Sequence, residues 1–144
     1  MATTLLWPII FPAVIALILF LIPRRIKLIR EVLALLSSMV ILYLGFSLFS
    51  LKNLALNVDW LGMGINFDFR LNQFSAFILL ALSGFLFLIT LYSSIKMKDH
   101  PRLREYYAYV FLAAAFSNGA VLANNFVLLI FFWEALLITT YALI

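Results

Sequence analysis

Glu134 is the residue whose type and position most clearly indicate chemistry. It is the one charged side chain between residues 106 and 144. In a helix over 126–144 it lies about 13 Å from the first residue, close to the middle of a membrane. An ionised carboxylate at that depth costs at least about 2.5 kcal/mol, so the group either binds a proton or finds a partner. Because such a group can load and release a proton, Glu134 is the predicted proton-transfer residue.

The helical neighbours of Glu134 supply no counter-ion. At helical spacing its face carries one polar side chain, Tyr141, two turns away, and otherwise Val127, Ile130, Phe131, Leu137 and Ile138. No Lys, Arg or His lies inside another apolar segment. A second polypeptide or ordered water must therefore complete the site. The alternative is a carboxylic acid held neutral by a backbone carbonyl, with no function.

Other polar residues within apolar segments are weaker candidates. Ser117 and Asn118 belong either to a proton pathway or to helix packing, and packing is favoured because polar residues in membrane helices more often join helices. Ala115 and Gly119 have the spacing of a close helix contact. The remaining members of this group are Ser37, Ser38, Ser83 and Thr90.

The chain offers no recognisable cofactor or metal site. It has no cysteine and a single histidine, His100, which excludes thiolate-bound metals, disulfides and multi-histidine sites. No phosphate-binding glycine loop or nucleophile elbow is present. An enzyme acting alone is therefore not expected, and neither is a nucleic-acid partner, because the formal charge of +4 comes from short basic stretches between apolar segments.

Composition identifies an integral membrane protein that positions these residues on helices. The chain is 67% hydrophobic and 11% charged, against about 45–50% and about 25% in soluble domains. Charge-free intervals, with a break at the polar pair Asn124 and Asn125, predict helices at about 5–22, 32–51, 73–95, 106–123 and 126–144. The expected fold is all-α, a single membrane domain over 1–144, with no separate water-soluble domain.

The connections between these segments differ in charge. Basic residues gather after the first span, at Arg24, Arg25, Lys27 and Arg30, and again after the third, at Lys96, Lys98, Arg102 and Arg104. The positive-inside rule then places the N-terminus outside and the C-terminus in the cytoplasm. The external connection, 52–72, alternates apolar and polar residues around two glycines, which predicts a short β-hairpin. The alternative is an irregular loop with Trp60 at the lipid headgroups.

Two segments resemble a known family. Residues 67–95, FDFRLNQFSAFILLALSGFLFLITLYSSI, and 121–144, VLANNFVLLIFFWEALLITTYALI, are similar to the antiporter-like subunits of respiratory complex I, membrane-bound hydrogenases and Mrp-type cation/proton antiporters. In that family a segment F-x-F-x-L-D-x-L-S opens the third helix, and Trp-Glu followed by Tyr-x-Leu-Ile lies on the fifth. Here these positions correspond to Trp133, Glu134 and Tyr141 to Ile144.

The resemblance implies that Glu134 is the family's proton-transfer glutamate, which faces a lysine on the seventh helix. Asn72 departs from the pattern, because the family usually has aspartate there. Family members are also several times longer, with about fourteen helices, so the lysine and the second half-channel are missing from these residues. A second half on another chain, an incomplete chain and a shortened subunit are the three explanations.

Three hypotheses for function follow. The first is a membrane subunit of an ion-translocating oxidoreductase of the complex I or hydrogenase kind, in a prokaryotic plasma membrane. It contributes Glu134 to a proton or sodium-linked path, while iron–sulfur clusters, flavin or a nickel–iron centre lie on partner subunits. The expected partners are lipid and other membrane subunits, including one with a lysine near Glu134. The second is part of an Mrp-type antiporter without redox partners. The third is a structural subunit with a vestigial glutamate.

Overall fold

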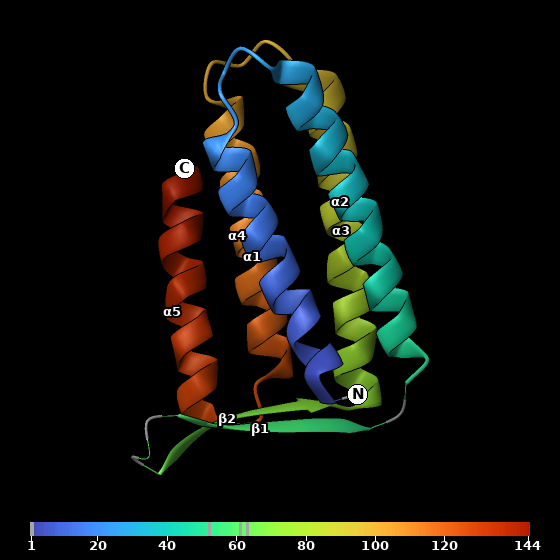
Figure 1. Cartoon of the computed structure of the whole chain (residues 1–144), viewed down its shortest axis with the longest axis vertical. Helices are drawn as coiled ribbons and strands as arrows, with labels where there is room; N and C mark the ends of the chain where they lie inside the picture. Colours follow the sequence, from blue (N-terminus) through green and yellow to red (C-terminus); the bar gives the residue numbers. More distant parts are fainter. Residues whose placement is uncertain (1, 52, 61, 63) are drawn as a thin grey trace.

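The computed structural model describes residues 2–51, 53–60, 62 and 64–144, which form five long helices with a two-stranded hairpin across one end (Figure 1). The elements in chain order are a short 3-10 helix Ala2–Leu6, α1 Trp7–Leu21, α2 Lys27–Phe49, β1 Leu54–Trp60, β2 Ile65–Leu71, α3 Gln73–Lys96, α4 Leu103–Leu122 and α5 Phe126–Leu143. The predicted class, an all-α membrane protein with a hairpin between its second and third helices, is confirmed.

Four stretches of the described chain are long and apolar enough to cross a membrane, Thr3–Leu21, Lys27–Phe49, Gln73–Lys96 and Phe126–Leu143. The sequence predicted five. The fifth, α4, has the required length at 20 residues, but its tyrosines, Ser117 and Asn118 lower its hydropathy. It packs against α1, α3 and α5, so a less apolar sequence suits a helix with neighbours on several sides.

Two helices begin earlier than predicted. α2 starts at Lys27 instead of residue 32, and α4 starts at Leu103 instead of residue 106. The predicted limits followed charge-free intervals, and these mark the apolar part of a helix, whereas backbone hydrogen bonds continue through charged residues at its end. Arg30 therefore lies inside α2, not in the connection before it.

The structure confirms the hairpin that the alternation in residues 52–72 predicted. β1 and β2 are antiparallel, with Leu54 opposite Leu71, Leu56 opposite Phe69 and Val58 opposite Phe67. These pairs share one face because side chains alternate along a strand. The turn contains Gly62 and Gly64, with φ of +63° and +73°, a backbone region that glycine adopts without strain. Leu61 and Met63, which flank Gly62 in the sequence, lie outside the described residues.

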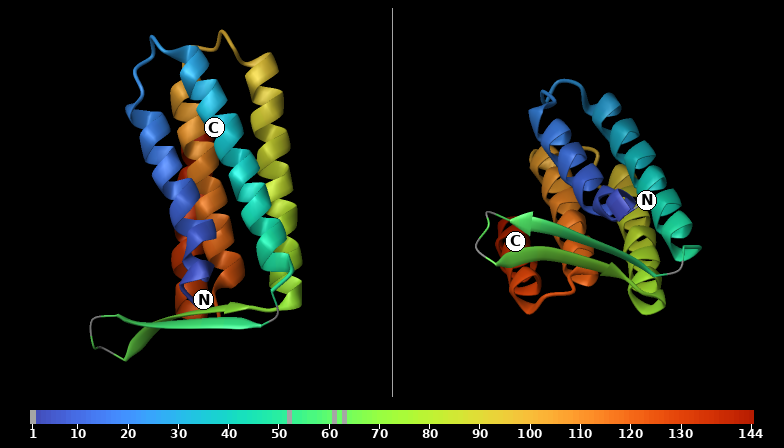
Figure 2. Two further views of the ribbon diagram at one scale, coloured as in Figure 1. Left: turned by 45° about the vertical axis from the view of Figure 1, so that its right-hand side comes forward. Right: turned by 60° about the horizontal axis from the view of Figure 1, so that its bottom comes forward.

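The apolar face of the hairpin covers one end of the helix bundle (Figure 2). Phe69 and Leu71 are buried in one cluster with Leu5, Leu48 and Phe132. The hairpin is also joined to the connection between α4 and α5. The Asn124 amide N–H donates to the Asp68 carbonyl oxygen at 2.9 Å, and Asn124 Nδ2 donates to Asp68 Oδ2 at 2.7 Å. The predicted break at Asn124 and Asn125 is confirmed as the boundary between α4 and α5.

The helices alternate in direction, so the connection from α1 to α2 and that from α3 to α4 lie together at the end away from the hairpin (Figures 1 and 2). α4 packs on α1 and α5, while α2 packs on α3. A second buried cluster fills the half of the bundle near these connections, and it includes Leu19, Ala34, Leu86, Tyr107 and Phe111. This arrangement brings both basic connections to one end of the molecule.

Candidate functional site

α5 presents two faces of different character. Its buried residues are Leu128, Phe132 and Thr139, which point toward the bundle. Glu134 is exposed, and it shares the outward face with Val127, Ile130, Phe131, Leu137, Ile138 and Tyr141, all of them exposed. α5 packs on α4, and it is the least buried of the four membrane-length stretches. The outward face of α5, defined by these seven residues, is therefore not covered by the described chain.

Glu134 has no partner within residues 2–51, 53–60, 62 and 64–144. Among these residues no hydrogen bond or ion pair involves its carboxylate, whereas Thr139 and Thr140 nearby donate to the carbonyl oxygens of Ala135 and Leu136 at 2.7 and 2.9 Å. Glu134 is the ninth of the 18 residues of α5. A carboxylate halfway along a membrane helix and directed away from its own bundle requires a bound proton or a partner from elsewhere.

Tyr141 lies on the same outward face, with 82% of its surface exposed. Its position two turns from Glu134 agrees with the helical spacing in the sequence. Within the described residues its phenol forms no hydrogen bond. The structure thus places Glu134 and Tyr141 on one surface, separate from Ser117 and Asn118, which lie on α4.

Asn118 faces α1 from α4 and is 2% exposed. Its Nδ2 donates to the Pro8 carbonyl oxygen at 2.8 Å. Pro12 lies four residues after Pro8 inside α1, and because proline has no N–H, it cannot form the helical hydrogen bond to that oxygen. Asn118 replaces the missing donor. This contact supports packing, the favoured interpretation of Asn118.

Ser117 is half-buried, and Gly119 marks the close contact between α4 and α5. A Cβ atom at Gly119 would overlap the ring of Phe132 on α5. The small-residue spacing at Ala115 and Gly119 therefore does correspond to a close helix contact. Ser117 forms no hydrogen bond among the described residues, and nothing in the structure connects it to Glu134.

Three of the buried hydroxyl groups that the sequence analysis named bond to their own helices. Ser38, Ser83 and Thr90 donate to the carbonyl oxygens of Leu35, Leu80 and Leu86 at 2.7–2.8 Å. Such local bonds satisfy a polar side chain in an apolar interior. These hydroxyls lie within the bundle, whereas Glu134 points away from it, so they form no continuous route to Glu134 within the described chain.

Arg30 and Tyr107 are among the buried polar residues that were not recognised from the sequence. Arg30 is 2% exposed and Tyr107 is fully buried. The sequence does contain a signal for Arg30. It precedes Ala34, Ser37 and Ile41 by four, seven and eleven residues, and all of these are buried, so Arg30 shares their helical face.

Comparison with known proteins supports an antiporter-type membrane protein. No protein-family model matches the chain. It is 33% identical over 92 residues to the putative antiporter subunit mnhA2 of Staphylococcus saprophyticus, a match that covers 62% of this chain and 12% of that protein. It is 31% identical over 88 residues to the A1 subunit of the Na(+)/H(+) antiporter of Staphylococcus haemolyticus, covering 60% of this chain and 11% of the relative. Staphylococcus aureus has a relative with the same identity and coverage.

The matched part of the chain thus spans about a tenth of the length of these relatives. The similarity agrees with the antiporter-like part of the resemblance stated above. None of these three relatives is named as a subunit of complex I or of a hydrogenase. The chain is an integral membrane protein similar, over about three fifths of its length, to large subunits of Na(+)/H(+) antiporters.

Proposed function

We propose that this chain is part of a subunit of a membrane cation/proton antiporter and that Glu134 carries the proton. The observation that supports the proposal is the outward face of α5, where a carboxylate halfway along an apolar helix lacks any partner in the described chain. The similarity to Na(+)/H(+) antiporter subunits supports a metal cation and a proton as the transported ions.

In this proposal, uptake and release of a proton by Glu134 depend on what covers the outward face of α5. Against hydrocarbon, the neutral form of a glutamate side chain is favoured in general, because the charged form is poorly solvated there. A cation brought close by a neighbouring helix, a lysine in the first instance, stabilises the carboxylate and releases the proton. When that cation moves away, the carboxylate binds a proton again. Exchange of a metal cation for a proton needs this alternation between the protonated and the charged form of the side chain.

The partners in this proposal are other membrane segments, one of which supplies a lysine near Glu134. Ser117 and Asn118 contribute to the packing of helices. Tyr141 lies with Glu134 on the outward face of α5. The N-terminus is outside and the C-terminus cytoplasmic, as the basic connections predict. The similarity to antiporter subunits favours the antiporter over the oxidoreductase hypothesis, in which iron–sulfur, flavin or nickel–iron centres reside on partner subunits.

Sodium-dependent proton exchange in everted membrane vesicles tests this function. Glu134→Gln keeps the shape of the side chain but cannot titrate, so we expect exchange to fall by about 100-fold or more, as for loss of a general acid or base. Thr140→Val is the matched control, since Thr140 is exposed on the same helix and bonds only to its own backbone. It should retain more than half of the exchange.

Two other outcomes would reject the proposal. Exchange that requires an electron donor, together with co-purified iron–sulfur or nickel–iron subunits, would favour the oxidoreductase. Unchanged exchange in Glu134→Gln, with normal assembly of the complex, would leave Glu134 with a structural role alone.

A further inference from the structure

Arg30 presents hydrogen-bond donors inside the protein without acceptors. It lies in the first turns of α2, near the end of the bundle away from the hairpin. Although only 2% of its surface is exposed, its Nε and Nη1 atoms have no hydrogen-bond partner in the described chain. Burying a guanidinium group without acceptors is costly, so the site lacks a component that accepts hydrogen bonds.

The same region holds two further unpaired donors, the buried Tyr107 hydroxyl and Arg104 Nε, both on α4. Ala34, one turn after Arg30 on α2, is buried in the same cluster as Tyr107, and Arg30 interacts electrostatically with Glu31, Tyr107 and Arg104. These side chains therefore lie in one neighbourhood. The Arg104 guanidinium also lies over the Phe20 ring of α1, 5.0 Å from its centroid. Residues of α1, α2 and α4 therefore surround a set of donors that are all without an acceptor.

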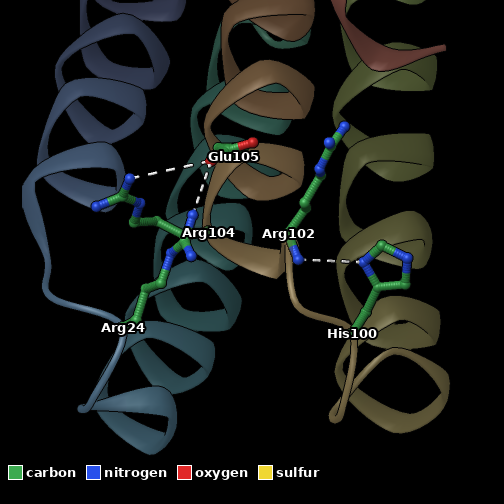
Figure 3. Close-up of polar contacts among 5 residues, drawn as sticks. All are labelled: Arg24, His100, Arg102, Arg104 and Glu105. Atoms are coloured by element: carbon green, nitrogen blue, oxygen red, sulfur yellow. Dashed lines mark hydrogen bonds and ion pairs between the residues drawn. The ribbon is translucent and has the colours of Figure 1, made fainter.

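The carboxylates at this end do not supply the acceptor. Glu105 Oε1 lies 3.3 Å from Arg24 Nη2 and 4.0 Å from Arg104 Nη2 (Figure 3). Glu31 interacts electrostatically with Arg30 and Tyr107, but within the described chain its carboxylate accepts no hydrogen bond and forms no ion pair. The two connections and adjoining helix ends at this end of the bundle carry eight basic and three acidic residues. The excess of positive charge favours an anion over a neutral molecule.

We propose that Arg30, Tyr107 and Arg104 bind a phosphate oxyanion, supplied by the headgroup of an anionic phospholipid. A phosphate group offers several acceptor oxygens, which matches the guanidinium and phenol donors. The basic end of the bundle lies where a membrane helix bundle meets the headgroups, and basic pockets between membrane helices bind such lipids. Soluble inorganic phosphate offers the same chemistry, and the experiment separates the two sources.

The experiment measures thermal unfolding of the purified chain in detergent during titration with three probes. These are short-chain phosphatidylglycerol, short-chain diacylglycerol, which lacks phosphate, and inorganic phosphate at an ionic strength matched with potassium chloride. A molecule that binds the folded state raises the unfolding midpoint, and the concentration dependence gives an apparent Kd. The variants are Arg30→Gln and Tyr107→Phe. Arg25→Gln is the control, because Arg25 is exposed at the same end and loses the same charge.

We expect phosphatidylglycerol to bind the native chain and diacylglycerol to have no effect. Arg30→Gln should weaken binding by about tenfold or more, and Tyr107→Phe by about two- to tenfold, as for loss of a charged and a neutral hydrogen bond. Arg25→Gln should change it less than about twofold. Equal stabilisation by inorganic phosphate, with the same dependence on Arg30, would support the oxyanion site and assign it to a soluble anion.

Equal losses in Arg25→Gln and Arg30→Gln would overturn the proposal, because general surface charge would then explain the binding. Equal effects of phosphatidylglycerol and diacylglycerol would overturn it as well. Tyr107→Phe removes one hydroxyl group and no charge, so it keeps the test valid if Arg30→Gln fails to fold.

Discussion

The helices α4 and α5 follow each other in the chain and have similar lengths, yet they place their polar residues differently. α4 turns Asn118 toward α1, where it replaces a backbone donor that Pro12 cannot provide. α5 turns Glu134 away from the bundle, where no described residue accepts or donates a hydrogen bond to it. The fold gives the Asn118 amide nitrogen a partner, but it gives the Glu134 carboxylate none within the described residues.

This difference separates two kinds of polar residue in a membrane protein. A polar group with a partner in its own bundle stabilises the packing of helices, and its removal should lower stability. A charged group without such a partner adds nothing to the stability of these helices. In the proposed function, such a group acts together with a component outside the described residues. The following predictions test that distinction.

The contact between α4 and α5 should be the most sensitive to substitution. Gly119→Ala places a Cβ against the buried Phe132 ring, and we expect it to lower the free energy of unfolding by about 1–3 kcal/mol. The control is Gly84→Ala in α3, where a Cβ would meet nothing within 4 Å. It should be neutral or stabilising by up to about 1 kcal/mol. Equal effects of the two variants in thermal unfolding would contradict the close contact.

Loss of the hydrogen bond from Asn118 to Pro8 should have the second largest effect on the free energy of unfolding. Asn118→Leu leaves the Pro8 carbonyl oxygen buried without a donor, and we expect a loss of about 1–2 kcal/mol in the free energy of unfolding. Ser117→Ala, at the adjacent position without a hydrogen bond, should change it by less than about 0.5 kcal/mol.

A double-mutant cycle tests the reason for that loss. In Pro12→Ala the residue at position 12 regains an N–H that can donate to Pro8. The cost of Asn118→Leu should therefore be smaller in the Pro12→Ala background than in the native chain. An unchanged cost would mean that Asn118 acts through packing volume and not through its hydrogen bond.

Asn72 should show a smaller, purely local effect at the start of α3. Its Oδ1 accepts from the Ser75 amide at 2.8 Å, and Ser75 Oγ accepts from the Asn72 amide at 2.9 Å. Asn72→Ala should cost about 1 kcal/mol, whereas Asn72→Asp should retain the cap and cost much less. Similar losses in both variants would show that the side-chain cap is not what stabilises this end.

Glu134 should show the smallest effect on stability. Glu134→Gln should change the free energy of unfolding of the isolated chain by less than about 0.5 kcal/mol, because no described group is bonded to the carboxylate. Thermal unfolding in detergent provides the measurement. A loss of more than about 1 kcal/mol would reveal a partner within the chain and contradict the comparison of α4 with α5.

The sequence was sufficient to predict much of the fold because membrane helices depend on hydropathy and charge. The boundary at Asn124 and Asn125 was found from two polar residues, and the hairpin was found from alternation around Gly62 and Gly64. The start of α2 was missed, since backbone hydrogen bonds extend past the first charge. Burial of Arg30 was missed for the same reason, because a charge next to a basic cluster was assigned to the connection.

The candidate site could be predicted only in part. The position of Glu134 along its helix follows from counting residues, and the identity of the residues that share its face follows from helical spacing. The exposure of that face does not, because α5 is apolar on all sides. Contacts between distant segments do not follow from either. The role of Asn118 depends on Pro8 and Pro12 lying beside it in α1, which needs the three-dimensional packing of α4 on α1.

Photo-crosslinking on α5 tests the central claim, that Glu134 is completed by a membrane segment outside residues 1–144. Benzoylphenylalanine replaces either Phe131, which is 58% exposed beside Glu134, or Phe132, which is 7% exposed against α4. In native membranes, position 131 should capture a helix beyond these residues that carries a lysine, and position 132 should form crosslinks within the described bundle. Capture of lipid alone at position 131 would contradict the account.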